Sequence, residues 1–108
     1  MKSIIRMIAK YNSKHYKNEA NVTLTCCPTR PGGEIPIMSD SIYLDLKHDN
    51  KREPERELIS LRLQSDGSFP EIESTDGFAI PDMEILIDFF QLAKRINGIL
   101  EGDTDEND

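Results

Sequence analysis

The sequence predicts an α+β domain: an antiparallel meander of four to five strands, with one long C-terminal helix packed on one face and a disordered acidic tail. Three observations favour this class. Segments in which polar and apolar residues alternate recur between residues 21 and 74, and such alternation is typical of half-buried strands. An Asp-Gly pair at 66–67 separates two of these segments, as in a tight hairpin. The apolar residues of 81–100 follow helical spacing instead.

The charge of the chain is acidic and unevenly distributed. The 108 residues carry a net charge of −7, and we expect a single domain over residues 1–100. Residues 1–30 sum to +5 and residues 31–108 to −12. The last eight residues contain no basic residue, which predicts a disordered acidic tail at 101–108. The layout indicates either a basic contact region near the start or an ordinary solvated surface.

Residues 4–11 fit two structures. A strand would place these apolar side chains on one face: Ile5, Met7, Ala9 and Tyr11. A helix would align Ile4, Ile8 and Tyr11, with Lys2, Arg6 and Lys10 opposite. Periodicity does not decide so short a run. We favour a strand, because isoleucine prefers strands and the following segments are strand-like. The segment is too short and too interrupted by charge for a signal peptide or a membrane span, so we expect a cytoplasmic protein without membrane contact.

The next two strands are predicted at residues 21–27 and 41–47, where apolar and polar residues alternate. A connection over 28–40, with Gly32-Gly33 at its tip, joins them, and a charged loop over 48–57 follows. Adjacent side chains on a strand point to opposite faces, so Cys26 and Cys27 cannot easily form a disulfide with each other. Cys26 is expected in the core and Cys27 on the surface, which suits a reducing compartment.

Residues 58–64 and 69–74 form the best-specified unit, a hairpin around Asp66-Gly67. The primed turn of such a hairpin needs positive φ, which glycine adopts readily. The turn fixes the register of the strands. It places Leu61 opposite Ile72 and Leu63 opposite Pro70 on the core face, and Arg62 opposite Glu71 on the outer face.

Residues 81–100 predict a long helix that is apolar around most of its circumference. Pro81 suits the first position, Asp82 and Glu84 suit the positive helix end, and Gly98 is expected to end the helix. The polar positions form one narrow stripe: Glu84, Asp88, Gln91 and Arg95. A helix packed on one neighbour needs an apolar sector of about 100°. The surplus predicts a homodimer interface at Met83, Ile87 and Phe90. The alternative is that the sheet and the 28–40 connection cover these residues.

Residues 10–17 combine basic and aromatic side chains, a mixture that holds single-stranded nucleic acid in other proteins. The candidate binding residues are Lys10, Tyr11, Lys14, His15, Tyr16 and Lys17, joined on the outer sheet face by Tyr43 and Arg62. The alternative is a solvated connecting loop whose tyrosines anchor it to the core. The acidic net charge also disfavours nucleic-acid binding.

Catalytic and metal sites are not predicted. Both histidines fall in predicted loops, and the chain has no CxxC or HxxxH spacing, nucleophile elbow or phosphate loop. We therefore expect no cofactor, no metal and no enzymatic activity. The leading hypothesis is a small macromolecule-binding module, homodimeric through its C-terminal helix, of the kind found among phage or bacterial accessory proteins. Single-stranded nucleic-acid binding is the alternative. An acidic mimic of nucleic acid is a third option, which the basic first third of the chain argues against.

Overall fold

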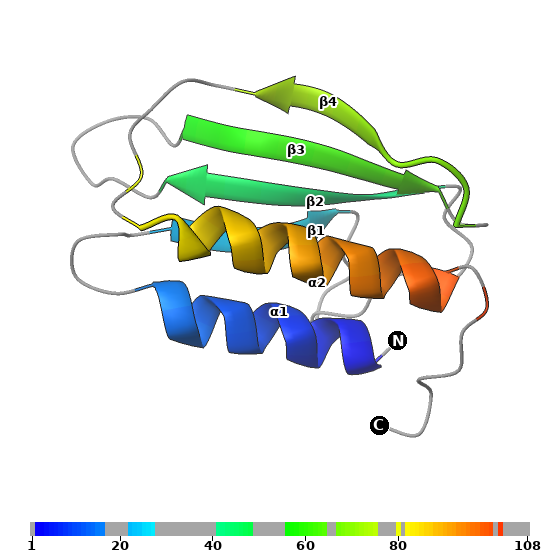
Figure 1. Ribbon diagram of the computed structural model, residues 1–108, viewed down its shortest axis with the longest axis horizontal. Coiled ribbons are helices and arrows are strands. Elements are labelled where there is room, and N and C mark those ends of the chain that lie inside the picture. Colours follow the sequence, from blue (N-terminus) through cyan, green and yellow to red (C-terminus); the bar gives the residue numbers. More distant parts are fainter. Residues whose placement is uncertain are drawn as a thin grey trace.

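The computed structural model describes residues 2–16, 22–27, 41–48, 56–64, 67–75, 80, 82–100 and 102. In these residues the chain forms a four-stranded antiparallel sheet with two helices on one face, which confirms the predicted α+β class (Figure 1). In chain order the elements are α1 (Lys2–His15), β1 (Val22–Cys27), β2 (Ser41–His48), β3 (Arg56–Gln64), β4 (Glu71–Thr75) and α2 (Glu84–Leu100).

The strands follow a simple meander in the order β1-β2-β3-β4. The predicted hairpin register is confirmed at two pairs, because Leu61 lies opposite Ile72 and Arg62 opposite Glu71. The pairing of Leu63 with Pro70 is not formed, since β4 begins only at Glu71. Gly67 has a φ of 76°, the positive value that the turn was expected to need.

The preference for a strand at residues 4–11 was wrong, because the segment lies within helix α1. As a helix, the segment buries Ile4, Tyr11 and His15 on the side that packs against the sheet and α2. Arg6, Lys10 and Lys14 stay exposed, and Lys14 reaches toward α2. The helix also includes residues 10–15, which had been expected in a loop. A strand would have left half of these apolar residues on the far side of the sheet.

Helix α2 spans Glu84–Leu100, close to the expected bounds. The Asp82 carboxylate accepts a hydrogen bond from the Glu84 backbone N–H at 3.0 Å and so caps the first turn. Gly98 does not close the helix, which continues to Leu100, the last residue of the predicted range. Gly102 instead follows the end, with a φ of 109° and its N–H donating to the Ile99 carbonyl at 3.1 Å.

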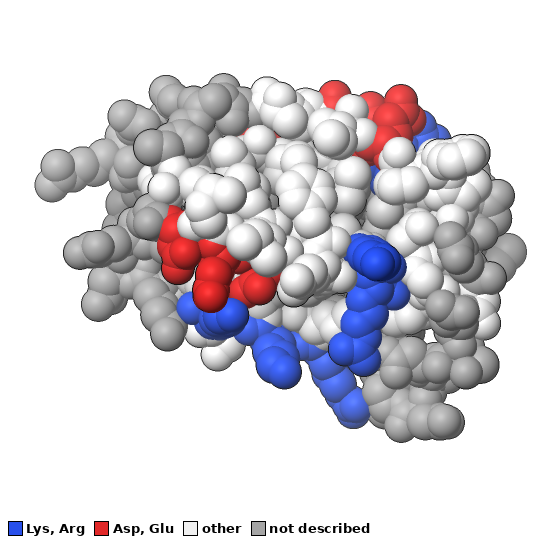
Figure 2. Space-filling model, viewed as in Figure 1, with Lys and Arg blue, Asp and Glu red and all other residues white. Residues whose placement is uncertain are grey.

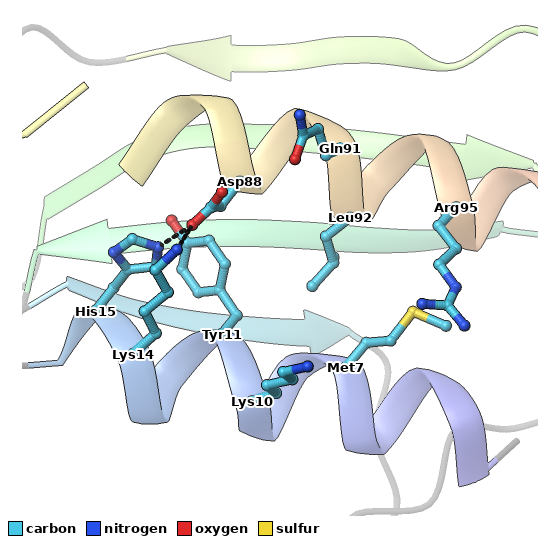
Figure 3. Close-up of a pocket in the computed structure, with 9 residues that line it drawn as sticks. All are labelled: Met7, Lys10, Tyr11, Lys14, His15, Asp88, Gln91, Leu92 and Arg95. Atoms are coloured by element: carbon cyan, nitrogen blue, oxygen red, sulfur yellow. Dashed lines mark hydrogen bonds and ion pairs between the residues drawn. The ribbon is translucent and has the colours of Figure 1, made fainter. Parts of the chain in front are cut away.

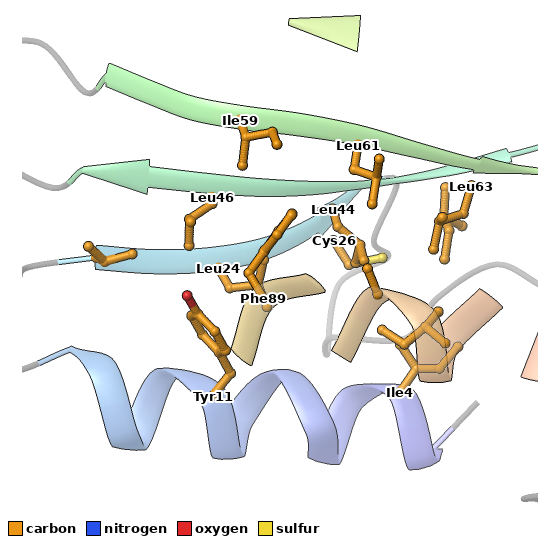
Figure 4. Close-up of a cluster of buried hydrophobic side chains, with 14 of the residues drawn as sticks. Ile4, Tyr11, Leu24, Cys26, Leu44, Leu46, Ile59, Leu61, Leu63 and Phe89 are labelled. Carbon is orange, nitrogen blue, oxygen red and sulfur yellow. The ribbon is translucent and has the colours of Figure 1, made fainter. Parts of the chain in front are cut away.

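The core lies between the helices and the inner face of the sheet (Figure 4). Helix α2 contributes Ile85, Phe89, Ala93 and Ile96. The strands contribute a row of inward side chains: Val22, Leu24, Cys26, Ile42, Leu44, Leu46, Ile59, Leu61 and Leu63. Cys26 is buried and Cys27 exposed, both as free thiols, which confirms the predicted placement.

Several expectations lie outside the described residues: the 28–40 connection with its glycine pair, most of the 48–57 loop, Pro81, and all of the acidic tail except Gly102. At the ends of the expected 48–57 loop, His48 lies in β2 and residues 56–57 lie in β3. Among the helices described, none has the length and apolar character needed to cross a membrane.

Candidate functional site

Helix α2 exposes a row of large apolar side chains on the side that faces away from α1. Met83 is 65% exposed, Ile87 47% and Phe90 45%. Their spacing of four and then three residues places them on one stripe of the helix. These are the three residues predicted for a dimer interface, and the described residues leave them uncovered.

The exposed stripe borders a hollow between α2 and β4, with a volume of about 390 Å³. Its lining is mostly apolar and comprises Leu61, Leu63, Pro70, Ile72, Phe90, Ala93, Lys94 and Asn97. Ile72 lies on the predicted face of the sheet, yet it is 57% exposed. The reason is visible in Figure 1, where α1 and α2 lie over the lower part of the sheet and β4 extends beyond α2.

Together the stripe and the hollow form what we call the α2–β4 surface: Pro70, Ile72, Met83, Ile87 and Phe90. Figure 2 shows an uncharged area in the middle of the molecule, with acidic residues at the beginning of α2, a basic group over its later part, charged residues at the upper right and further basic residues along the edge formed by α1. Lys94 belongs to the lining of the hollow. Isolated apolar side chains are common on protein surfaces, but a contiguous group beside a groove is typical of an interaction site.

The polar stripe of α2 has a different role, because it faces helix α1 (Figure 3). One oxygen of Asp88, Oδ2, lies 2.8 Å from Lys14 Nζ and 2.8 Å from His15 Nε2. Glu84 adds a longer contact to Lys14, at 3.4 Å. The hydrogen bonds from Lys14 and His15 hold the pKa of Asp88 below its usual value, and the bond to Asp88 raises the pKa of Lys14.

Tyr11 lies beneath this ionic cluster and joins the two helices. Its hydroxyl donates a 2.6 Å hydrogen bond to the Ile85 carbonyl, and its ring contacts the His15 ring at a centroid distance of 4.5 Å. Burial, followed by the charge of Asp88, raises the pKa of Tyr11 well above its usual value. The cluster therefore ties α1 to α2 and stabilises the fold.

A second hollow of about 410 Å³ lies between the two helices and includes this cluster. Lys10 and Arg95 flank it, and Met7 and Leu92 form part of its apolar lining (Figure 3). The residues that line it include no serine, threonine or cysteine that His15 could activate. His15 is itself buried and engaged with Asp88. In the described part of the chain, no three His, Cys, Asp or Glu residues gather as metal ligands.

The residues of the nucleic-acid hypothesis do not form one surface. Lys10 and Lys14 are exposed on α1, but Tyr11 and His15 are buried, so their rings cannot stack on bases. Tyr16 is half exposed, and Lys17 lies outside the described residues. Tyr43 and Arg62 are paired neighbours on the other face of the sheet, where Arg62 contacts Glu71 and Glu73.

Sequence reasoning missed two contributors to these surfaces. The exposure of Ile72 and Pro70 could not be read from alternation, which shows only which face a residue takes. The polar stripe of α2 was recognised, but its partners on α1 were not, because that segment was assigned to a strand and a loop. The basic spacing of Arg6, Lys10 and Lys14, four residues apart, was the signal that could have indicated a helix.

Comparison of the chain with protein-family models, with curated proteins and with solved structures finds no match. The function must therefore be argued from the surfaces of the molecule alone.

Proposed function

We propose that this protein is a small, non-enzymatic binding module that works as a homodimer, with the α2–β4 surface as the contact between the two copies. The observation that carries the proposal is the contiguous exposure of Met83, Ile87, Phe90 and Ile72. These side chains leave on the order of 400 Å² of apolar surface uncovered, a size that in other proteins often marks an interaction site.

A second copy is the occupant that suits this surface. An interface across a two-fold axis uses the same patch on both chains, so that patch must be complementary to itself. The α2–β4 surface contains a ridge, formed by Met83, Ile87 and Phe90, and beside it a hollow lined by Pro70 and Ile72. An apolar patch of this kind can pack against the same patch of a second copy. In this arrangement the basic side of α1 stays available to a further macromolecule.

The test is the solution mass of the protein and of Phe90→Asp, measured by light scattering over a range of concentrations. We expect the natural chain at twice its own mass and Phe90→Asp as a folded monomer, because a buried carboxylate in an apolar interface is strongly unfavourable. Gln91→Asp is the matched control. It adds the same charge one residue away, beside the hollow shared with α1, and it should remain dimeric. A natural chain that stays monomeric at high concentration would refute the proposal.

A second candidate function is binding of single-stranded nucleic acid, and one observation favours it. Arg6, Lys10 and Lys14 form an exposed basic row along α1, in which Lys14 also contacts Asp88 and Glu84. Figure 2 shows basic side chains along its lower edge. Contacts from this row would reach phosphates and would not involve stacking on Tyr11. Fluorescence anisotropy with a labelled oligonucleotide tests it, since phosphate contacts must weaken as salt increases. Lack of binding at low salt, or binding insensitive to salt, would exclude this candidate.

A further inference from the structure

The exposed side of α2 has the residue spacing of a helix–helix seam. Positions 83, 87, 90, 94 and 97 are separated alternately by four and three residues, the interval of core positions in coiled coils. Met83, Ile87 and Phe90 fill the first three positions, Lys94 is exposed at the fourth, and Asn97 is partly buried at the fifth. A stripe of this kind packs along a second helix at a shallow crossing angle.

The charges of α2 distinguish the two possible directions of that second helix. Outside the stripe that faces α1, Asp82 lies just before the helix begins and Lys94 lies near its end. A parallel pair would place acidic residues against acidic residues. An antiparallel pair would place each acidic end beside the basic end of the other copy, and it would also align the two helix dipoles favourably.

We infer that two copies associate through an antiparallel α2–α2 seam, with the two-fold axis between Ile87 and Phe90. This inference rests on the proposed dimer and specifies its geometry. In this register Ile87 of each copy packs against Phe90 of the other, and Met83 packs against the aliphatic part of Lys94. The Lys94 ammonium then reaches toward Asp82 of the second copy, while its methylene groups cover apolar surface.

The edge of strand β4 is a less suitable contact. It lies at the end of the described sheet, and all five of its residues are exposed. An antiparallel pairing of two β4 strands that engages all five residues would place Glu73 directly opposite Glu73. Like charges in that position are unfavourable, and charged residues on edge strands commonly prevent such pairing. The helix seam is therefore the contact that the charges permit.

Disulfide trapping tests the direction of the seam. In a Cys27→Ser background, one protein carries Met83→Cys and a second carries Lys94→Cys. Buried Cys26 is retained in both. In the antiparallel seam, positions 83 and 94 of different copies are neighbours, whereas two copies of position 83 lie about 16 Å apart along the helix, which is too far for a disulfide. We therefore expect a cross-linked dimer only when the two proteins are mixed, allowed to exchange and mildly oxidised.

Other outcomes separate this inference from the proposed function. Cross-linking of each protein alone would indicate a parallel seam, and dimers without any cross-link would indicate another contact. Both results would refute the antiparallel seam but would remain compatible with the proposed dimer. A natural chain that is monomeric would refute both. If a cysteine variant dissociates, charge reversal supplies the second test: Lys94→Glu should weaken the dimer, and adding Asp82→Lys should restore it. Lack of restoration would contradict the antiparallel seam.

Discussion

The side chain of Asn12 binds both backbone polar groups of Leu24. Asn12 Oδ1 accepts a hydrogen bond from the Leu24 N–H at 2.7 Å, and Asn12 Nδ2 donates to the Leu24 carbonyl at 2.9 Å. Leu24 lies on β1, which pairs on one side with β2 and forms one end of the described sheet. Helix α1 thus satisfies the open backbone groups of Leu24 on this edge strand, which would otherwise offer hydrogen bonds to another chain.

Replacement of Asn12 by Ala should destabilise the protein by about 1–3 kcal/mol, because it leaves two partly buried backbone groups without partners. The free energy of unfolding, from urea denaturation followed by circular dichroism, measures this. Ser13→Ala is the control, since Ser13 is exposed on the same helix. It truncates a polar side chain at the next position and should change stability by no more than about 0.5 kcal/mol. Equal losses in the two variants would contradict the role assigned to Asn12.

Tyr11→Phe should cost about 1–2 kcal/mol of stability. The ring and its packing remain, but the hydrogen bond from the hydroxyl to the Ile85 carbonyl is lost, and this carbonyl keeps only its bond within the first turn of α2. The measurement is again the free energy of unfolding. Tyr43→Phe is a suitable comparison because Tyr43 lies on the other face of the sheet, only partly buried. A loss of stability confined to Tyr43→Phe would show that the helix contact contributes little.

The Asp88 cluster should make stability depend on pH at the acidic end. The pKa of Asp88 is below its usual value in the folded protein, because Lys14 and His15 donate hydrogen bonds to the carboxylate. Its contribution is therefore present above the unfolded-state pKa of about 3.9 and is lost as the pH falls through the lower folded-state pKa. Asp88→Asn should be less stable than the natural chain near neutrality, and this difference should disappear in strong acid. A difference that persists unchanged there would refute the linkage.

Leu61 and Ile72 are opposite each other in the sheet and should respond differently to truncation. Leu61 is 6% exposed, so Leu61→Ala should cost about 2–4 kcal/mol. Ile72 is largely exposed within one copy, so Ile72→Ala should cost the monomeric Phe90→Asp protein about 1 kcal/mol or less. Unfolding of both variants in that background gives the comparison. Similar losses at the two positions would mean that β4 is covered after all.

The two cysteines should differ in reactivity although they are adjacent. Burial raises the pKa of Cys26 to about 12, so its thiolate is scarce at neutral pH. Cys27 is exposed, and its pKa is raised less, first by partial burial and then by the nearby Asp45 carboxylate. A thiol reagent should modify Cys27 alone in the native protein and both residues after unfolding. Modification of both thiols at the same native rate would contradict this placement.

The hairpin shows how far local sequence determines this structure. The Asp-Gly turn and the alternation of residues 58–74 were sufficient to place Leu61 opposite Ile72 and Arg62 opposite Glu71. Both signals act between residues that are close in sequence, so they do not depend on how the rest of the chain packs. Helix α1 shows the limit. Ile4, Tyr11 and His15 share a face only if the segment is helical, and the benefit of that face comes from β1 and α2, which are distant in sequence.

The candidate site also has features that the sequence predicts and features that it does not. The apolar surplus of α2 and its narrow polar stripe are properties of the sequence, and they correctly indicated Met83, Ile87 and Phe90 as side chains that the described fold leaves exposed. The sequence did not indicate which part of the fold this polar stripe would contact. It faces α1, and Lys14 and His15 meet Asp88 there. Contacts between residues more than 70 positions apart depend on how the helices share one face of the sheet, which no local pattern encodes.

The sequence alone determined the strand alternation, the hairpin register, the separate placement of the two cysteines and the excess of apolar residues on the last helix. All of these follow from the periodicity of the backbone and from short-range turn chemistry. Tertiary structure alone decided that residues 2–15 are helical and that β4 extends beyond the helix layer. It also decided that the α2–β4 surface contains a hollow beside a ridge. The physical reason is that burial is a property of the whole packed chain: an apolar side chain is covered only where another element reaches it.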